Sequence, residues 1–172
     1  LHARKSDYDA LPMINNHTER VYGAMIASLD RGIGRVMAAL KAEGIDDNTL
    51  IIFSSDNGGA DYVGLPDLNA PYRGWKMTFF EGGTHVPFFM RWPDRIAAGS
   101  KYQRPVSHID IFSTAAAAAN VAVPADRALD GVDLLPYVNG EISGEPHEAL
   151  FWRTGNYRTV RSGDWKLQLS DP

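Results

Sequence analysis

A carboxylate, a carboxamide and two glycines directly follow an apolar segment in the first third of the chain. Residues 49–55 read Thr-Leu-Ile-Ile-Phe-Ser-Ser, and Asp56, Asn57, Gly58 and Gly59 come next. Side-chain oxygens of Asp and Asn are ligands suited to a hard cation such as Ca²⁺ or Mg²⁺. The same composition is also common in ordinary turns. On these residues alone, a turn at a strand end is the simpler interpretation and a cation site is the alternative.

A second group of chemically capable residues lies between Pro71 and Gly83. This segment contains the cations Arg73 and Lys76, the carboxylate of Glu81 and three glycines. A loop that exposes Lys and Arg beside a cation site is suited to binding an anionic ester. The alternative is a surface loop whose charged side chains are simply solvated, and for Arg73 this interpretation is preferred.

The elements that must position these residues follow an α/β pattern. The continuous apolar run in 49–55 predicts a strand buried on both faces, as in a parallel sheet. Ligands of such sheets lie beyond the carboxyl ends of the strands, where Asp56 and Asn57 stand. A capped helix before this strand is indicated by Asn16 and by a stripe at spacings of three and four: Tyr22, Met25, Ile26, Leu29, Ile33, Val36, Met37 and Leu40. Helix followed by strand is the α/β order.

The remaining chain predicts further elements of both kinds. We expect a loop at 1–15, a helix stop at Gly44 and a long polar loop at 60–73. A strand is predicted at 86–92, beginning or forming an edge at Pro87, and a helix at 108–120, capped by Ser107 with Asp110 in its first turn. A short apolar segment from Leu134, a strand at 149–152 and an antiparallel hairpin of 157–161 and 165–169 should follow.

Composition limits the function classes. The chain has 172 residues, of which 44% are hydrophobic, enough for a packed core. A net charge of −4 carries no electrostatic footprint for nucleic acid, so no nucleic-acid partner is expected. No run approaches the ~20 apolar residues of a membrane span. The absence of cysteine excludes disulfides within the chain. Leu1 does not begin a signal peptide, so we expect the chain to start inside a longer protein.

Several segments taken together resemble the sulfatase family of the alkaline-phosphatase-like superfamily. Each is weak alone, but their order and spacing match over nearly the whole chain: residues 22–26 with Leu29-Asp30, 55–59, 69–76 (Asn-Ala-Pro-Tyr-Arg-Gly-Trp-Lys), 80–87 (Phe-Glu-Gly-Gly-Thr-His-Val-Pro) with Trp92-Pro93, 108–112, 129–132 and 161–167.

The resemblance implies a fold and a division of the chain. It implies a partial parallel-sheet sandwich of the alkaline-phosphatase-like α/β type, followed by the start of a small C-terminal antiparallel sheet. Residues 1–147 would be the C-terminal part of the catalytic α/β domain, and residues 148–172 the truncated start of the antiparallel subdomain. The family's N-terminal half, which carries the nucleophile, is expected to be absent.

The resemblance also implies a chemistry. Asp56 and Asn57 match calcium ligands of the family, with Mg²⁺ as the other option, and Lys76 matches the catalytic lysine that contacts the sulfate group. The nucleophile is a formylglycine made from a Cys-x-Pro-x-Arg or Ser-x-Pro-x-Arg motif, and neither motif occurs in this sequence. We therefore expect the parent protein to be a sulfuric ester hydrolase of the arylsulfatase type and the isolated chain to be inactive.

The same comparison assigns structural roles to other residues. Arg73 and Glu81 are expected to shape their loop by pairing. His85 stands where relatives commonly have Arg, and both His85 and His108 are expected to be structural. His2 resembles a residue just after the family's catalytic histidine, so it is not taken as that histidine.

Other interpretations stay open at this point. One is a phosphodiesterase or phosphonate hydrolase of the same superfamily. Another is a non-catalytic chain that binds a cation or a partner, since its nucleophile motif is missing. Self-association, or association with the missing N-terminal half, is expected. For the substrate, a sulfated glycan, a steroid sulfate and a small aryl sulfate all stay open. Localisation stays open as well, since members of the family are often periplasmic, secreted or lysosomal.

Overall fold

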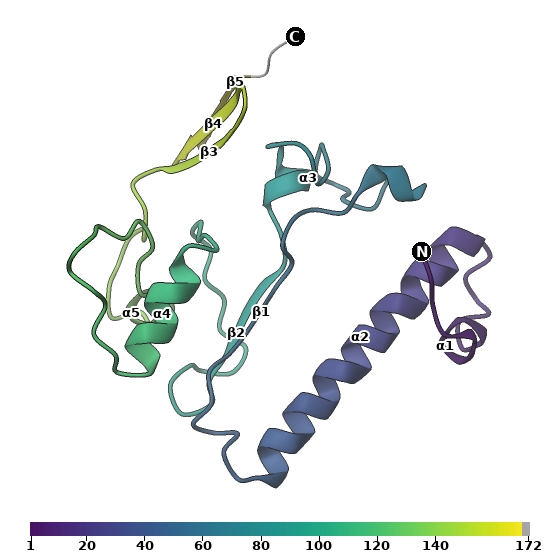
Figure 1. Cartoon of the computed structure of the whole chain (residues 1–172), viewed down its shortest axis with the longest axis horizontal. Helices are drawn as coiled ribbons and strands as arrows, with labels where there is room; N and C mark the ends of the chain where they lie inside the picture. Colours follow the sequence, from purple (N-terminus) through teal and green to yellow (C-terminus); the bar gives the residue numbers. More distant parts are fainter. Residues whose placement is uncertain (170–172) are drawn as a thin grey trace. The chain divides into compact units, whose positions relative to one another are not determined.

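The computed structural model describes residues 1–169, and its elements mix helices with small sheets (Figure 1). Two compact units divide the chain: Leu1–Asp47 with Ser54–Phe88, and 48–53 with 89–169. The elements in order are α1 (Lys5–Asp9), α2 (His17–Ala42), β1 (Ile51–Ser54), the 3₁₀ turn η1 (Asp61–Val63), α3 (Glu81–Thr84), β2 (Phe88–Arg91), α4 (Asp110–Ala118), α5 (Leu135–Val138), β3 (Leu150–Thr154), β4 (Tyr157–Ser162) and β5 (Trp165–Leu169).

The predicted capped helix is confirmed as α2. Oδ1 of Asn16 accepts hydrogen bonds from the amides of Thr18 at 2.9 Å and Glu19 at 3.1 Å, which satisfies two amides that a helix start leaves without partners. At the other end, Gly44 has a φ of +69°, the left-handed conformation that stops a helix.

The structure corrects two expectations in this region. Residues 1–15, predicted as loop, contain the short helix α1, which an Arg31–Asp7 ion pair of 2.9 Å ties to α2. The apolar stripe of α2 is also less covered than its periodicity implies. Ala24 is the buried residue of this helix, whereas Leu29 is 50% exposed and Val36 is 60% exposed. Periodicity therefore identifies the helix without identifying what covers its apolar face.

Strands β1 and β2 form a two-stranded sheet. Both lie inside the predicted strands 49–55 and 86–92, and β2 begins directly after Pro87, which has no amide hydrogen for a sheet. The rings of Phe53 and Phe89 pack with their centroids 6.2 Å apart. All four residues of β1 are half-buried rather than buried, so the expectation of a strand buried on both faces is not met within residues 1–169.

The helix predicted at 108–120 is α4, but it begins later and for a different reason. It starts at Asp110, with no side-chain cap bond at its N-terminus among the described residues. Ser107 is therefore not the capping side chain. Instead, the Asp110 carboxylate accepts a hydrogen bond from the Ser107 amide at 2.7 Å.

Asp110 is the centre of a buried polar cluster. Its carboxylate is 0% exposed and also accepts from the amide of Val132 at 3.0 Å. Nε2 of His147 lies 2.8 Å from Asp110 Oδ1, and the His147 side chain is only 8% exposed. A hydroxyl of α4 bonds to the segment that contains Val132, since Thr114 Oγ1 accepts from the amide of the fully buried Leu134 at 3.0 Å. The cluster therefore ties α4 to two segments that follow it.

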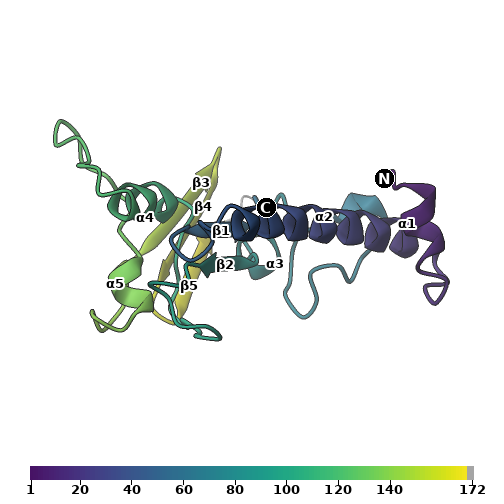
Figure 2. The same cartoon turned by 90° about the horizontal axis from the view of Figure 1, so that it is seen from below.

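The predicted hairpin is confirmed within a three-stranded antiparallel sheet of order β3-β4-β5 (Figure 2). Its register pairs Phe151 with Val160 and Val160 with Leu167, which places these three residues on one face. That face is open, because Phe151 is 75% and Leu167 73% exposed. Residues 170–172 of the predicted segment 148–172 lie outside the described residues. In the part of the chain described, no helix is both long and apolar enough to cross a membrane.

Candidate functional site

Asp56 and Asn57 follow the end of β1, as predicted. Asp56 is exposed and Asn57 is half-buried. The hydroxyl of Ser55 donates to the backbone oxygen of Asn57 at 2.8 Å, which fixes the turn. Within the described residues, the Asp56 carboxylate has no hydrogen bond or ion pair. It therefore remains available to a ligand.

The long loop after this turn folds back onto it. The amide of Lys76 donates to the backbone oxygen of Gly59 at 3.2 Å, and the amide of Gly58 donates to the oxygen of Gly83 at 3.1 Å. The backbone of Lys76 thus lies against Gly59, two residues after Asn57. The structure brings the segments of all three predicted site residues into one loop cluster.

Close backbone contacts explain two of the glycines in this cluster. A Cβ added at Gly58 would lie 1.7 Å from the backbone oxygen of Gly82, a separation that no side chain tolerates. Gly74 has a φ of +91°, and a Cβ there would lie 2.4 Å from Oγ1 of Thr78. Glycine is thus needed at position 58 because a side chain would collide with the neighbouring backbone, and at position 74 because the backbone has a positive φ.

One residue of this cluster escaped the sequence reasoning. Oδ1 of Asn69 accepts a hydrogen bond from the Gly59 amide at 2.7 Å. Its Nδ2 donates to the oxygen of Gly59 at 2.9 Å and to that of Gly74 at 3.2 Å. Asn69 entered the sequence argument only as the first residue of the 69–76 motif. Its position shortly before Pro71 in a glycine-rich loop was the available signal.

The charged neighbours of Lys76 make contacts inside the loop. The guanidinium carbon of Arg73 lies 4.1 Å from the centre of the Phe80 ring, so Arg73 stacks on an aromatic ring where we expected ion pairing. The Glu81 carboxylate lies 3.4 Å from Nδ1 of His85, whose ring also packs 4.6 Å from that of Tyr72. These contacts are consistent with the structural roles expected for the three residues.

Lys76 differs from Arg73 in its surroundings. It is exposed, and no hydrogen bond or ion pair of its ammonium group is found within residues 1–169. An unpaired ammonium on a hydrogen-bonded loop is available to an anion. The geometry fits the predicted role.

The residues present supply part of a cation site. Asp56 and Asn57 contribute oxygen donors of the kind that Ca²⁺ and Mg²⁺ prefer, but Ca²⁺ takes about 6–8 of them. In the described part of the chain, no group of three or more His, Cys, Asp or Glu side chains is placed to hold a metal ion. The donor chemistry therefore fits a hard cation, and the ligand set is incomplete.

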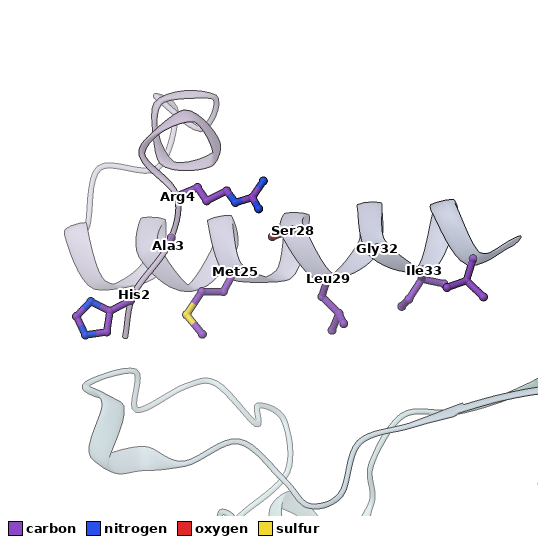
Figure 3. A pocket seen from close by; sticks show the side chains of 9 residues that line it. His2, Ala3, Arg4, Met25, Ser28, Leu29, Gly32 and Ile33 are labelled. Atoms are coloured by element: carbon purple, nitrogen blue, oxygen red, sulfur yellow. The ribbon is translucent and has the colours of Figure 1, made fainter. Parts of the chain in front are cut away.

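A separate groove of about 580 Å³ runs along α2 (Figure 3). Its walls are mainly the exposed apolar stripe of this helix together with residues near the N-terminus: His2, Ala3, Arg4, Met25, Ser28, Leu29, Gly32, Ile33 and Val36. His2 is the lone titratable ring of this lining, and no carboxylate faces it there. The groove has the character of a packing surface rather than a reaction centre.

The fold brings the segments of Asp56, Asn57 and Lys76 together after the end of β1. Comparison with known proteins identifies the family to which this arrangement belongs. The sulfatase family model matches residues 3–121. An uncharacterized sulfatase of Escherichia coli, YdeN, is 42% identical over 133 residues, which cover 77% of this chain and 23% of that protein. Steryl-sulfatase of Rattus norvegicus is 37% identical over 168 residues, covering 88% of this chain and 28% of that protein. The chain belongs to the sulfatase family.

Solved structures agree with this assignment and with the predicted fold class. Ps i-CgsB in complex with k-i-k-neocarrahexaose superposes with a TM-score of 0.88 at 32% identity, covering 99% of this chain and 38% of that one. The phosphonate monoester hydrolase SpPMH of Silicibacter pomeroyi gives a TM-score of 0.60 at 24% identity, covering 87% of this chain and 34% of that one, a likeness of fold alone. The chain spans about a quarter of the length of the curated relatives described above.

Proposed function

We propose that this chain supplies the cation- and sulfate-binding part of a sulfate-ester hydrolase. Family membership supports the reaction class. The observation that carries the proposal to individual residues is the hydrogen bond of 3.2 Å from the Lys76 amide to the Gly59 oxygen. This bond joins the backbone of Lys76, which carries the unpaired ammonium, to the turn that contains Asp56 and Asn57.

In this proposal each residue has a distinct electrostatic task. Oxygens of Asp56 and Asn57 hold a divalent cation, Ca²⁺ or Mg²⁺, together with ligands from outside the described cluster. The ammonium of Lys76 donates to a sulfate oxygen. Donors placed in advance stabilise negative charge most where that charge grows, so Lys76 acts mainly in the transition state, as the S–O bond breaks.

The nucleophile comes from elsewhere in this proposal. When present, a formylglycine supplies the hydrated aldehyde that attacks sulfur. The chain has no cysteine and neither of the motifs from which formylglycine is made. We therefore propose that this chain alone hydrolyses nothing. The active form in this proposal is a longer protein that has the length of a sulfatase and includes the nucleophile segment, called the sulfatase-length protein below.

Two of the similar proteins point to different leaving groups for the ester. One relative is named for steryl sulfates, and one structural neighbour holds a carrageenan-type hexaose. Both support a sulfate ester as substrate, because they share the family and differ in what the ester is attached to.

Hydrolysis of an aryl sulfate and of an aryl phosphonate monoester should be measured for this chain and for the sulfatase-length protein. We expect the longer protein to prefer the sulfate and the chain to be inactive. Preference for the phosphonate would favour the phosphonate hydrolase alternative. An active, pure chain would overturn the external nucleophile.

Calcium titration by calorimetry separates the enzyme from a non-catalytic binding chain. With two ligands of the roughly six needed, the chain should bind Ca²⁺ weakly, and Asp56→Asn should weaken that binding further. Tight binding that survives Asp56→Asn would place a cation site elsewhere and favour a non-catalytic, cation-binding function.

We also propose that the chain associates with further sulfatase sequence or with a second copy. Support comes from large apolar side chains on two surfaces, since Val36 on α2 is 60% exposed and Trp165 on β5 is 85% exposed. Exposed patches of large apolar side chains are typical of interfaces. Light scattering should show self-association at high concentration, and a stable monomer there would contradict it.

A further inference from the structure

We propose that Asn69 is a positioning residue that fixes Lys76 relative to the Asp56–Asn57 pair. This inference rests on the proposed function of the loop. Asn69 itself touches neither the cation nor the sulfate in this proposal. It acts through the backbone of two glycines that flank the residues that do.

The contacts of Asn69 imitate a short piece of β-ladder. Its carboxamide accepts from the Gly59 amide at 2.7 Å and donates to the Gly59 oxygen at 2.9 Å, so it satisfies both backbone groups of one residue. The second hydrogen of Nδ2 reaches the oxygen of Gly74 at 3.2 Å. Of the ordinary side chains, only the carboxamides of Asn and Gln offer one acceptor and two donors in a planar group, and Gln is longer by one methylene.

Both glycines bonded by Asn69 lie close in sequence to the proposed binding residues. Gly59 stands two residues after Asn57, and Gly74 stands two residues before Lys76. The Gly59 oxygen is a shared acceptor, since the Lys76 amide also donates to it at 3.2 Å. One half-buried side chain thus joins the strand-end turn to the lysine-bearing turn, and its loss leaves the Lys76–Gly59 backbone bond as a weaker link between them.

A purely local structural role would have different effects. Such a role would lower stability and leave the geometry between the two turns intact in the folded protein. A positioning role predicts that folded protein loses turnover, because misplacement of a catalytic group by about 1 Å costs ~10²-fold in rate. The test therefore needs a measurement on the folded loop besides activity.

The decisive substitution is Asn69→Asp, which keeps shape and acceptor and removes both donors. Asn16→Asp is the matched control, because Asn16 uses only its oxygen, to cap α2, and Asp serves that purpose equally well. Amide hydrogen exchange of Gly59 and Lys76 should be followed in both variants. Aryl sulfate hydrolysis by the sulfatase-length protein should be followed in parallel.

In Asn69→Asp a carboxylate oxygen faces the backbone oxygens of Gly59 and Gly74 in place of Nδ2, and this repulsion should move the side chain away from Gly59. We therefore expect lost exchange protection at Gly59 and Lys76, and a kcat lowered by about 10²-fold with a smaller change in KM. Acidification should restore part of the lost turnover relative to wild type, because a protonated carboxyl at position 69 regains one donor. Asn16→Asp should change neither the exchange protection of Gly59 and Lys76 nor kcat.

Unchanged exchange protection in folded Asn69→Asp would overturn the proposal, and so would lost protection with wild-type kcat. If the wild-type protein hydrolyses no sulfate ester, the proposed function fails by itself. Exchange protection, together with the Ca²⁺ affinity of Asn69→Asp, then decides the positioning role: weakened affinity with lost protection supports it, and unchanged affinity overturns it.

Discussion

Two aspartates of this chain show how the same side chain serves two different ends. Asp110 is fully buried, and its carboxylate receives the amides of Ser107 and Val132 and the ring of His147. Asp56 is exposed and, within residues 1–169, has no partner. The first carboxylate is fully used by the fold, whereas the second is free to bind something else.

The surroundings of the two aspartates explain the difference. Around Asp110, side chains hold segments together, so the polar atoms of those side chains are consumed. Around Asp56, backbone hydrogen bonds, glycine contacts and the single carboxamide of Asn69 hold the loop together. A loop held largely by its backbone can leave Asp56 and Lys76 available, as binding sites on rigid scaffolds require.

The largest expected effect concerns Asp110. Asp110→Ala leaves two amides and a histidine without their acceptor, and breaking such a buried polar pairing costs roughly 3–5 kcal/mol. The midpoint of denaturant unfolding, followed by tryptophan fluorescence, should fall accordingly. Asp94→Ala is the control, because Asp94 is an exposed aspartate and should change the midpoint little. Equal effects of the two substitutions would remove the contrast between buried and exposed carboxylates.

The next effect concerns turnover rather than stability. Lys76→Ala in the sulfatase-length protein should lower kcat by ~10²–10³-fold, the usual cost of one preorganised donor. Its unfolding midpoint should stay near wild type, because the ammonium makes no hydrogen bond or ion pair within the described residues. Near wild-type turnover would remove Lys76 from the site.

A contact-driven effect follows for the loop frame. Gly58→Ala forces a Cβ to 1.7 Å from the Gly82 oxygen, and the resulting shift should cost about 1–3 kcal/mol. Gly34→Ala on α2 is the matched control, since its Cβ meets nothing within 4 Å. That control should be neutral or stabilising by up to ~1 kcal/mol, because Ala favours helix. Opposite signs of the two midpoint shifts support the tight frame, and a neutral Gly58→Ala contradicts it.

Sequence reasoning reached the elements and the chemically capable residues but not the contacts that frame them. Asn16 capping and the helical period are local signals, and both were sufficient to predict α2. Asn69 bonds to residues ten and five positions away, so its role depends on how a loop closes on itself. No periodicity or propensity encodes such a closure.

The same limit explains the misplaced start of α4. Ser107 followed by Asp110 has the spacing of a cap, and the sequence gives no reason to prefer one direction of bonding over the other. The structure reverses it, since the Asp110 carboxylate receives the Ser107 amide. The cause is tertiary, because Val132 and His147 approach the same carboxylate from later in the chain.

The smallest effect separates two arginines that stack on aromatic rings in the two units. Arg73 lies 4.1 Å from the centre of the Phe80 ring, and Arg95 lies 5.6 Å from that of Trp92. An exposed contact of this kind contributes about 0.5–1 kcal/mol, so Arg73→Ala should lower the unfolding midpoint slightly and Arg95→Ala still less.

Turnover gives the sharper comparison for Arg73. If stacking on Phe80 is its role, Arg73→Ala should leave kcat close to wild type, whereas Lys76→Ala three residues later should not. A loss of turnover comparable to that of Lys76→Ala, with an unchanged unfolding midpoint, would mean that Arg73 also meets the substrate. The division between framing and binding side chains would then have to be drawn differently within residues 73–76, because both cations of this turn would contact the sulfate ester.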